Sequence, residues 1–210
     1  MVLRPRRDRG PTLLLADLAR AAGVLSLAVA AVWWGPVGVA VFALVLLGLV
    51  LPRVAAVPAG LDLACGVVLL AAAWFSFAGL YAAVAWLDLV VHLAATGLVA
   101  ALAHTLLVRG GALPSPDASV VHRPRLGIVV TTAALGLALG AAWEMGEWAG
   151  HTFIDGAISV GYDDTIGDLV AGGLGALTAG VALARAPGRR TAGVQPRATV
   201  RQPRATVRQP

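Results

Sequence analysis

The chain has 210 residues, of which 59% are hydrophobic and only 13% are charged, and its mean hydropathy is +0.82. Because a soluble domain usually carries about 25% charged residues, this composition excludes an ordinary soluble domain. It also argues against a nucleic-acid-binding domain, which the net charge of +5 could otherwise suggest. Long apolar runs recur along the chain, and each is long enough to cross a hydrocarbon core of about 30 Å. We therefore predict an all-α, polytopic membrane protein.

Turn signals divide the apolar sequence into six spans. Gly35-Pro36 and Pro52 each mark a boundary, since proline favours the first position of a helix and disfavours its interior. The expected spans are 12–34, 36–51, 61–80, 85–107, 126–149 and 164–184, within a transmembrane domain of residues 12–184. A basic segment, 1–11, precedes them. The Arg/Pro-rich tail, 185–210, contains RATVRQP twice and is predicted to be disordered, because it has too few large apolar residues to form a core.

The distribution of arginine predicts the topology. All sixteen basic residues are arginine, and they fall in the N-terminal segment, at Arg20 near the inner end of the first span, at Arg53, between Arg109 and Arg125, and in the tail. These positions lie on one side of a six-span arrangement, so both termini are predicted to be cytoplasmic. The opposite side carries Trp33, Trp34, Trp86, Trp143 and Trp148, as expected for an aromatic belt. We expect a multi-pass protein of the bacterial inner membrane.

Three charged residues fall near the predicted cytoplasmic ends of the spans. Asp17 and Arg20 are three residues apart, so a helix places them on one side as an interfacial ion pair. Asp62 opens the third span, and we interpret it as a helix cap or a solvated charge.

The most informative pattern is a set of polar residues at the predicted outer ends of spans four, five and six. Spacings of three or four residues place each pair on one helical face, and a rise of about 1.5 Å per residue keeps all of them near one depth. Charged groups inside membrane spans are costly and usually mark a functional site. The residues are Asp88, His92, Glu144, Glu147, Asp164 and Asp168.

Small residues indicate how these helices approach one another. Span five has glycines four apart at Gly136 and Gly140 and again at Gly146 and Gly150, and span six is rich in glycine. Such spacing allows close packing of membrane helices, although it also fits a face packed on lipid or on a second copy of the chain. The oligomeric state therefore stays open.

Carboxylates with one imidazole are ligands suited to a divalent ion such as Zn, Mn, Fe or Mg. We predict Asp88, His92, Glu144, Glu147, Asp164 and Asp168 as candidate metal ligands, and Glu144 and Glu147 as candidate catalytic groups. The ion could polarise a phosphoryl oxygen of an envelope lipid or lipid-linked substrate, or activate water. Without a metal, a carboxylate pair could act as general acid and base. No HExxH motif is present, so the pattern does not favour a zincin-type protease.

Two other classes of function remain open. The same acids could serve a small proton-coupled transporter, although such a relay needs titratable groups across the whole membrane. Alternatively, they could form a hydrogen-bonded network that only holds spans four, five and six together.

Three motifs resemble the YjdF-like bacterial inner-membrane proteins: Asp88-x-x-x-His92, the WEMGEW block at 143–148, and Asp164-Thr165-x-x-Asp168-Leu169. More distantly, the chain is similar to VanZ-like membrane proteins, which also carry Asp-x-x-x-His at the start of a span. The resemblance covers roughly residues 80–170. Because the YjdF-like family has no established activity, the resemblance implies an architecture and a shared polar cluster, not a reaction.

Overall fold

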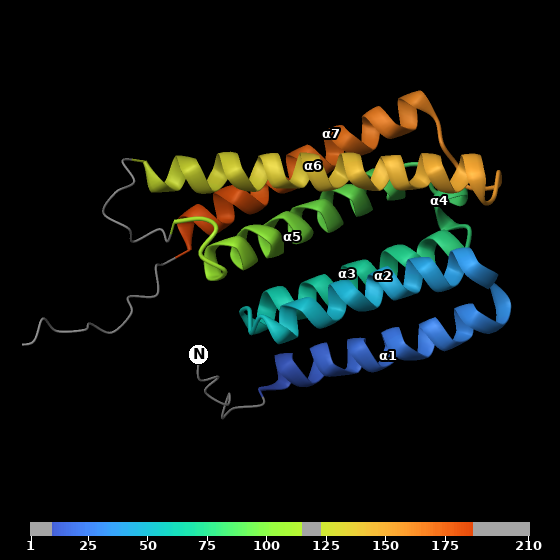
Figure 1. Ribbon diagram of the computed structural model, residues 1–210, viewed down its shortest axis with the longest axis horizontal. Coiled ribbons are helices and arrows are strands. Elements are labelled where there is room, and N and C mark those ends of the chain that lie inside the picture. The colour runs from blue at the N-terminus through green and yellow to red at the C-terminus, as the bar shows by residue number, and fades with distance from the viewer. Residues whose placement is uncertain (1–9, 115–122, 187–210) are drawn as a thin grey trace, which may run out of the picture.

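The computed structural model describes residues 10–114 and 123–186, and all regular structure in these ranges is helical (Figure 1). Six of the seven helices are long and apolar enough to cross a membrane, which confirms the predicted six-span, all-α fold. The short helix, α4, is the exception. The helices are α1 (Pro11–Trp33), α2 (Gly35–Val54), α3 (Ala59–Phe77), α4 (Leu80–Ala83), α5 (Leu87–Arg109), α6 (Pro124–Phe153) and α7 (Tyr162–Arg185).

The helix boundaries differ from the predicted ones by a few residues at most ends, and three of these differences bear on the fold. α2 continues through Pro52 to Val54, because a proline in the last turn removes only one hydrogen bond from the helix. α6 continues to Phe153, past the predicted end at residue 149. α4 forms a separate helical turn where only a tight link was expected, and it follows Gly79, whose positive φ of 69° ends α3.

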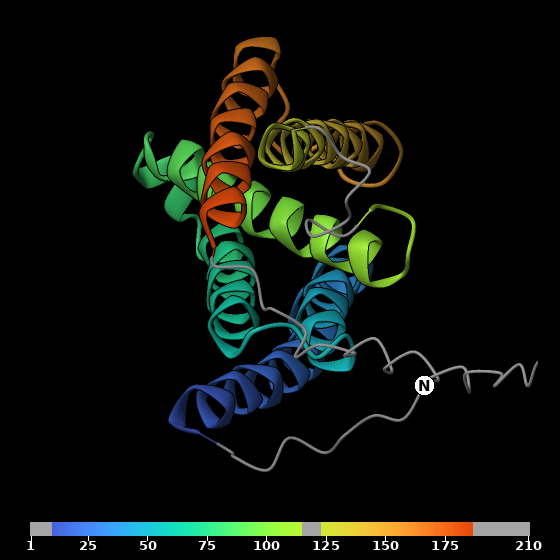
Figure 2. The same ribbon diagram turned by 90° about the vertical axis from the view of Figure 1, so that its left-hand side faces the viewer.

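The bundle consists of two three-helix units. α1, α2 and α3 pack on one another, α5, α6 and α7 do the same, and α3 packs against α5 between the units (Figures 1 and 2). α1 begins and α7 ends at the same end of the bundle, which we call the basic end because Arg53, Arg109 and Arg185 close the helices there. We call the opposite end, which holds α4, the aromatic end. The basic segment 1–9 and the tail from residue 187 onward, which was predicted to be disordered, lie outside the described residues.

Aromatic rings fill the N-terminal unit toward the aromatic end. Trp34 stacks on Phe77 with ring centroids 4.5 Å apart and meets Trp74 edge-on at 5.3 Å. Phe42, which is fully buried, is in ring contact with all three of these side chains. The Trp74 indole N–H donates a hydrogen bond to the Ser26 hydroxyl at 3.0 Å, so its polar atom is paired.

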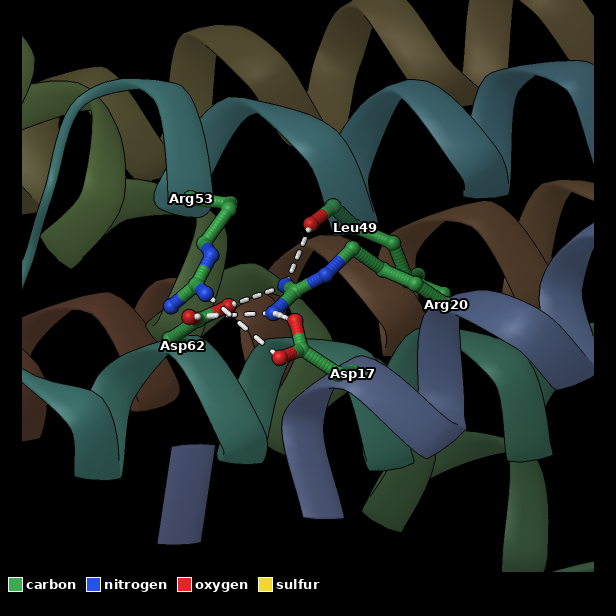
Figure 3. Close-up of polar contacts among 5 residues, drawn as sticks. All are labelled: Asp17, Arg20, Leu49, Arg53 and Asp62. Atoms are coloured by element: carbon green, nitrogen blue, oxygen red, sulfur yellow. Dashed lines mark hydrogen bonds and ion pairs between the residues drawn. The ribbon is translucent and has the colours of Figure 1, made fainter. Parts of the chain in front are cut away.

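The basic end of the N-terminal unit holds a charged cluster of Asp17, Arg20, Arg53 and Asp62 (Figure 3). Arg20 donates hydrogen bonds to Asp62 at 2.7 Å, to Asp17 at 2.7 Å and to the carbonyl of Leu49 at 3.1 Å. The expected ion pair between Asp17 and Arg20 is therefore confirmed. The interpretation of Asp62 as a cap or a solvated charge is wrong, because its side chain is 0% exposed and pairs with Arg20.

This charged cluster joins the three helices of its unit. Arg20 and Asp17 belong to α1, Leu49 and Arg53 to α2, and Asp62 to α3 (Figure 3). Two arginines and two aspartates balance in charge, which allows the group to lie within an apolar bundle. The N-terminal unit is thus held by rings at one end and by ion pairs at the other.

Candidate functional site

Three helices bring polar side chains together near the aromatic end of the C-terminal unit, with His92 of α5 at the centre. Its Nε2 lies 3.6 Å from Asp88 Oδ1 and 3.8 Å from Asp168 Oδ2 of α7. Its Nδ1 lies 3.9 Å from Glu144 Oε1 of α6. Asp168 and Glu144 are buried, and Asp88 and His92 are partly buried. We call Asp88, His92, Glu144 and Asp168 the site cluster.

One potential ligand atom from each of Asp88, His92 and Asp168 falls within a group whose members lie within 4.8 Å of one another. Atoms bound to one ion at about 2.0–2.2 Å from it lie roughly 3–4 Å apart. The group therefore comes close to the spacing around a shared ion but is wider than it.

The two remaining predicted site residues lie around this cluster. The Glu147 carboxylate interacts electrostatically with Glu144, Asp88 and Asp168, and Trp143 lies one helical turn before it on α6. Asp164 is exposed, and it interacts electrostatically with Asp88, Glu144 and Asp168. All six predicted residues therefore share one region, with four at its centre and two at its edge.

Close contact between α5 and α7 positions this cluster. A Cβ atom added to Gly175 would lie 1.9 Å from the Leu93 carbonyl oxygen, and one added to Gly97 would lie 2.8 Å from the Gly175 oxygen. Only glycine lets the two backbones approach so closely. The crossing lies within two helical turns of His92 and Asp168, so it sets the distance between them.

The predicted glycine contacts of α6 are only partly correct. Gly136 does pack closely, because a Cβ there would lie 2.2 Å from that of Ala176 on α7. Gly146 has open space around it, and a Cβ on Gly150 would meet only Ile158 in the following loop. Among the described residues, the second pair therefore makes no close contact with another helix.

Sequence reasoning missed two residues at the site. Thr165 lies in the first turn of α7 beside the Glu144 carboxylate, and the sequence pattern gave its side chain no role at the site. Tyr81 of α4 interacts electrostatically with Asp88, Glu147 and Asp168. No spacing rule connects a residue in a separate short helix to the other three helices, so no sequence signal pointed to it.

Contact lengths distinguish the site cluster from the charged cluster of the N-terminal unit. Arg20 makes ion pairs of 2.7 Å, whereas the three contacts of His92 measure 3.6–3.9 Å. Hydrogen bonds of nitrogen to oxygen are normally 2.7–3.2 Å long. The site cluster therefore gathers acceptors and an imidazole without pairing them closely, which is the condition in which a cation can be bound.

These features define an all-helical, six-span membrane protein with a carboxylate and histidine group between three helix ends. A family model described as predicted membrane protein (DUF2238) matches residues 12–189. The chain belongs to this family, which is the YjdF-like family, so the resemblance found in the sequence is confirmed. No curated protein and no solved structure matches the chain.

Proposed function

We propose that the site cluster binds a divalent cation and that the bound cation acts on an envelope lipid or lipid-linked substrate. The observation that carries this proposal is the spacing around His92, where carboxylates from three helices lie near one imidazole at 3.6–3.9 Å. Carboxylate and imidazole ligands suit Zn, Mn, Fe or Mg. Asp88, His92, Asp168 and Glu144 would hold the ion.

The charge around the cluster supports a cation as its ligand. The chain has no arginine between Arg53 and Arg109 or between Arg125 and Arg185, and it has no lysine. The carboxylates therefore have no basic side chain on α5, α6 or α7 to pair with at this depth, apart from His92 and the exposed His151, whose Nδ1 lies 2.6 Å from the Ile158 carbonyl oxygen. A cation would offset their mutual repulsion and would let an anionic headgroup approach.

The proposal also includes the orientation of the protein in the membrane. The arginines of the basic end favour a cytoplasmic location for that end under the positive-inside rule. The site then lies at the outer face of a bacterial inner membrane, level with lipid headgroups. Exposed Trp86, Trp148 and Tyr162 near the site would occupy the same interfacial layer.

Within the site, Glu147 would act beside the bound ion. It stands at the edge of the cluster, next to Glu144 but outside the group around His92. A carboxylate in that place could accept a proton from water attacking the substrate, while Glu144 contributes to holding the ion.

The rival functions receive less support. A scaffold network would be expected to show short contacts such as those of Arg20, and the contacts of His92 are longer. A proton carrier needs a route toward the basic end, whereas α5 and α7 are in backbone contact at Gly97 and Gly175 beneath the cluster.

Metal binding by the full-length protein in detergent tests the proposal directly. We expect Mn²⁺, titrated by calorimetry and by electron paramagnetic resonance, to bind at about one ion per chain. Asp168→Asn should weaken this binding at least tenfold, because it removes a charged ligand from the centre of the cluster.

Asp163→Asn is the matched control, because Asp163 is an exposed aspartate in the first turn of the same helix. It should retain the wild-type affinity for Mn²⁺. Wild-type protein that binds none of Mn²⁺, Zn²⁺, Fe²⁺ or Mg²⁺, or equal loss of binding in both variants, would exclude the proposed site.

A further inference from the structure

Thr96 of α5 packs between the other two helices of the C-terminal unit. A Cβ atom added to Gly172 of α7 would lie 2.9 Å from the Thr96 Oγ1, and one added to Gly140 of α6 would lie 3.9 Å from the Thr96 Cγ2. Gly172 in particular leaves room for the hydroxyl, because any larger residue there would press on it. The Thr96 side chain is therefore held in one place by contacts with both neighbouring helices.

These contacts place Thr96 next to the site cluster. On each helix, the contacting residue lies four residues from a member of the cluster, on the side of the basic end. The pairs are Thr96 and His92 on α5, Gly172 and Asp168 on α7, and Gly140 and Glu144 on α6. Four helical residues rise about 6 Å, so Thr96 lies one turn from the cluster toward the basic end.

The direction of the helices turns the side chains of Thr96 and Glu144 toward a common level. The Cα–Cβ bonds of a helix tilt toward its N-terminus. Because α5 begins at the aromatic end, Thr96 leans toward the site cluster (Figure 1). Because α6 runs the opposite way, Glu144 leans from the cluster toward Thr96 (Figure 1). The hydroxyl therefore faces the inner side of the site.

The hydroxyl of Thr96 differs from those of the other threonines in the middle of the spans. Each of those donates to a carbonyl three or four residues earlier in its own helix, and they are Thr105, Thr131, Thr132 and Thr178. Within the described part of the chain, Thr96 makes no such bond. A hydroxyl at membrane depth is costly without a partner, so that of Thr96 is suited to bind a ligand of the site.

The kind of cation decides whether such a hydroxyl is useful. The residues of the site cluster would complete a tetrahedral set of ligands around Zn²⁺. Mn²⁺ and Mg²⁺ prefer octahedral sets rich in oxygen, and Mg²⁺ usually keeps several of its waters. A water bound at about 2.1 Å from the ion, with a hydrogen bond of about 2.8 Å to a hydroxyl, spans roughly 5 Å. The position of Thr96, one turn away, fits such a water.

We propose that the Thr96 hydroxyl binds a water ligand of the cation and so shifts the preference of the site from Zn²⁺ toward Mn²⁺ or Mg²⁺. This inference rests on the proposed function. The water donates a hydrogen bond to the Thr96 oxygen, and the Thr96 O–H donates to the carboxylate of Glu144, which leans toward it. The hydroxyl thus holds both the water and one ligand of the ion in place.

The test compares the Mn²⁺ and Zn²⁺ affinities of the full-length protein in detergent, by calorimetry, before and after Thr96→Val. Valine keeps the shape of threonine and removes the hydroxyl. We expect the affinity for Mn²⁺ to fall about tenfold, as when a group that orients a metal ligand is lost. The affinity for Zn²⁺ should fall by less than about twofold, because the site cluster alone completes a tetrahedral set. Thr96→Ser retains the hydroxyl and should keep the wild-type preference.

Thr105→Val is the matched control, because Thr105 lies on the same helix and its hydroxyl already donates to the Ala101 carbonyl. It should bind both ions as the wild type does. Unchanged Mn²⁺ affinity in Thr96→Val, or an equal fall for both ions, refutes the role of Thr96 and leaves the cation site standing. Loss of the preference in Thr96→Ser also refutes it. Wild-type protein that binds Zn²⁺ but not Mn²⁺ refutes this inference alone, and protein that binds no divalent ion refutes both proposals.

Discussion

Replacing Arg20 with methionine is expected to lower the free energy of unfolding by about 3–5 kcal/mol, the usual cost of leaving one partner of a buried ion pair alone. Arg20 supplies the donors that pair with Asp62, whose side chain is 0% exposed, and it also binds Asp17 and the carbonyl of Leu49. Methionine fills a similar volume but leaves the Asp62 charge without its partner. Unfolding of the detergent-solubilised protein, followed by tryptophan fluorescence, measures the effect.

A second substitution separates the lost charge from the lost packing. In the double variant Arg20→Met/Asp62→Asn, no buried charge remains unpaired, and Arg53 can still pair with Asp17, from which it now lies 3.4 Å away. We expect this variant to recover at least half of the lost stability, because neutral replacements avoid the cost of an uncompensated charge. A double variant no more stable than Arg20→Met alone would show that the ion pair does not carry the effect.

The sequence predicted the six spans and the meeting of the site residues because both follow from local rules. Apolar length determines a span, and the spacing of Asp88 and His92, or of Glu144 and Glu147, places each pair on one helical face whatever its neighbours. The common depth of these residues in the membrane then follows from the helical rise of about 1.5 Å per residue. Together, the two rules place the polar faces of the three helix ends at one depth, where they can converge.

Features that depend on packing between distant helices could not be predicted in this way. Asp62 appeared solvated because its partner, Arg20, lies 42 residues earlier in the chain. Tyr81 appeared to belong to a link, because nothing local predicts the short helix α4 that carries it. Gly146 has the same spacing to Gly150 as Gly136 has to Gly140, yet only Gly136 meets another helix closely. Residue spacing identifies which residues share a helical face, but it does not show what packs against that face.

Gly175→Ala is expected to cost on the order of 3 kcal/mol of stability, at the upper end of the range for overpacked interiors. The added Cβ would fall 1.9 Å from the Leu93 carbonyl oxygen, and a backbone atom cannot move aside as a flexible side chain can. α5 and α7 must then separate, which carries His92 away from Asp168. We therefore also expect the affinity for Mn²⁺ to fall by about tenfold or more, measured on the fraction that remains folded after size-exclusion chromatography.

Gly146→Ala provides the comparison, because this helical glycine has no neighbouring atom within 4 Å of an added Cβ. Alanine is favoured over glycine inside a helix by roughly 0.5–1 kcal/mol, so this variant should match or slightly exceed the wild type in stability and should bind Mn²⁺ normally. If Gly175→Ala were as stable as Gly146→Ala, the glycine crossing would not be what holds α5 and α7 in place. If it lost stability but kept its metal affinity, the crossing would hold the two helices without setting the distance between His92 and Asp168.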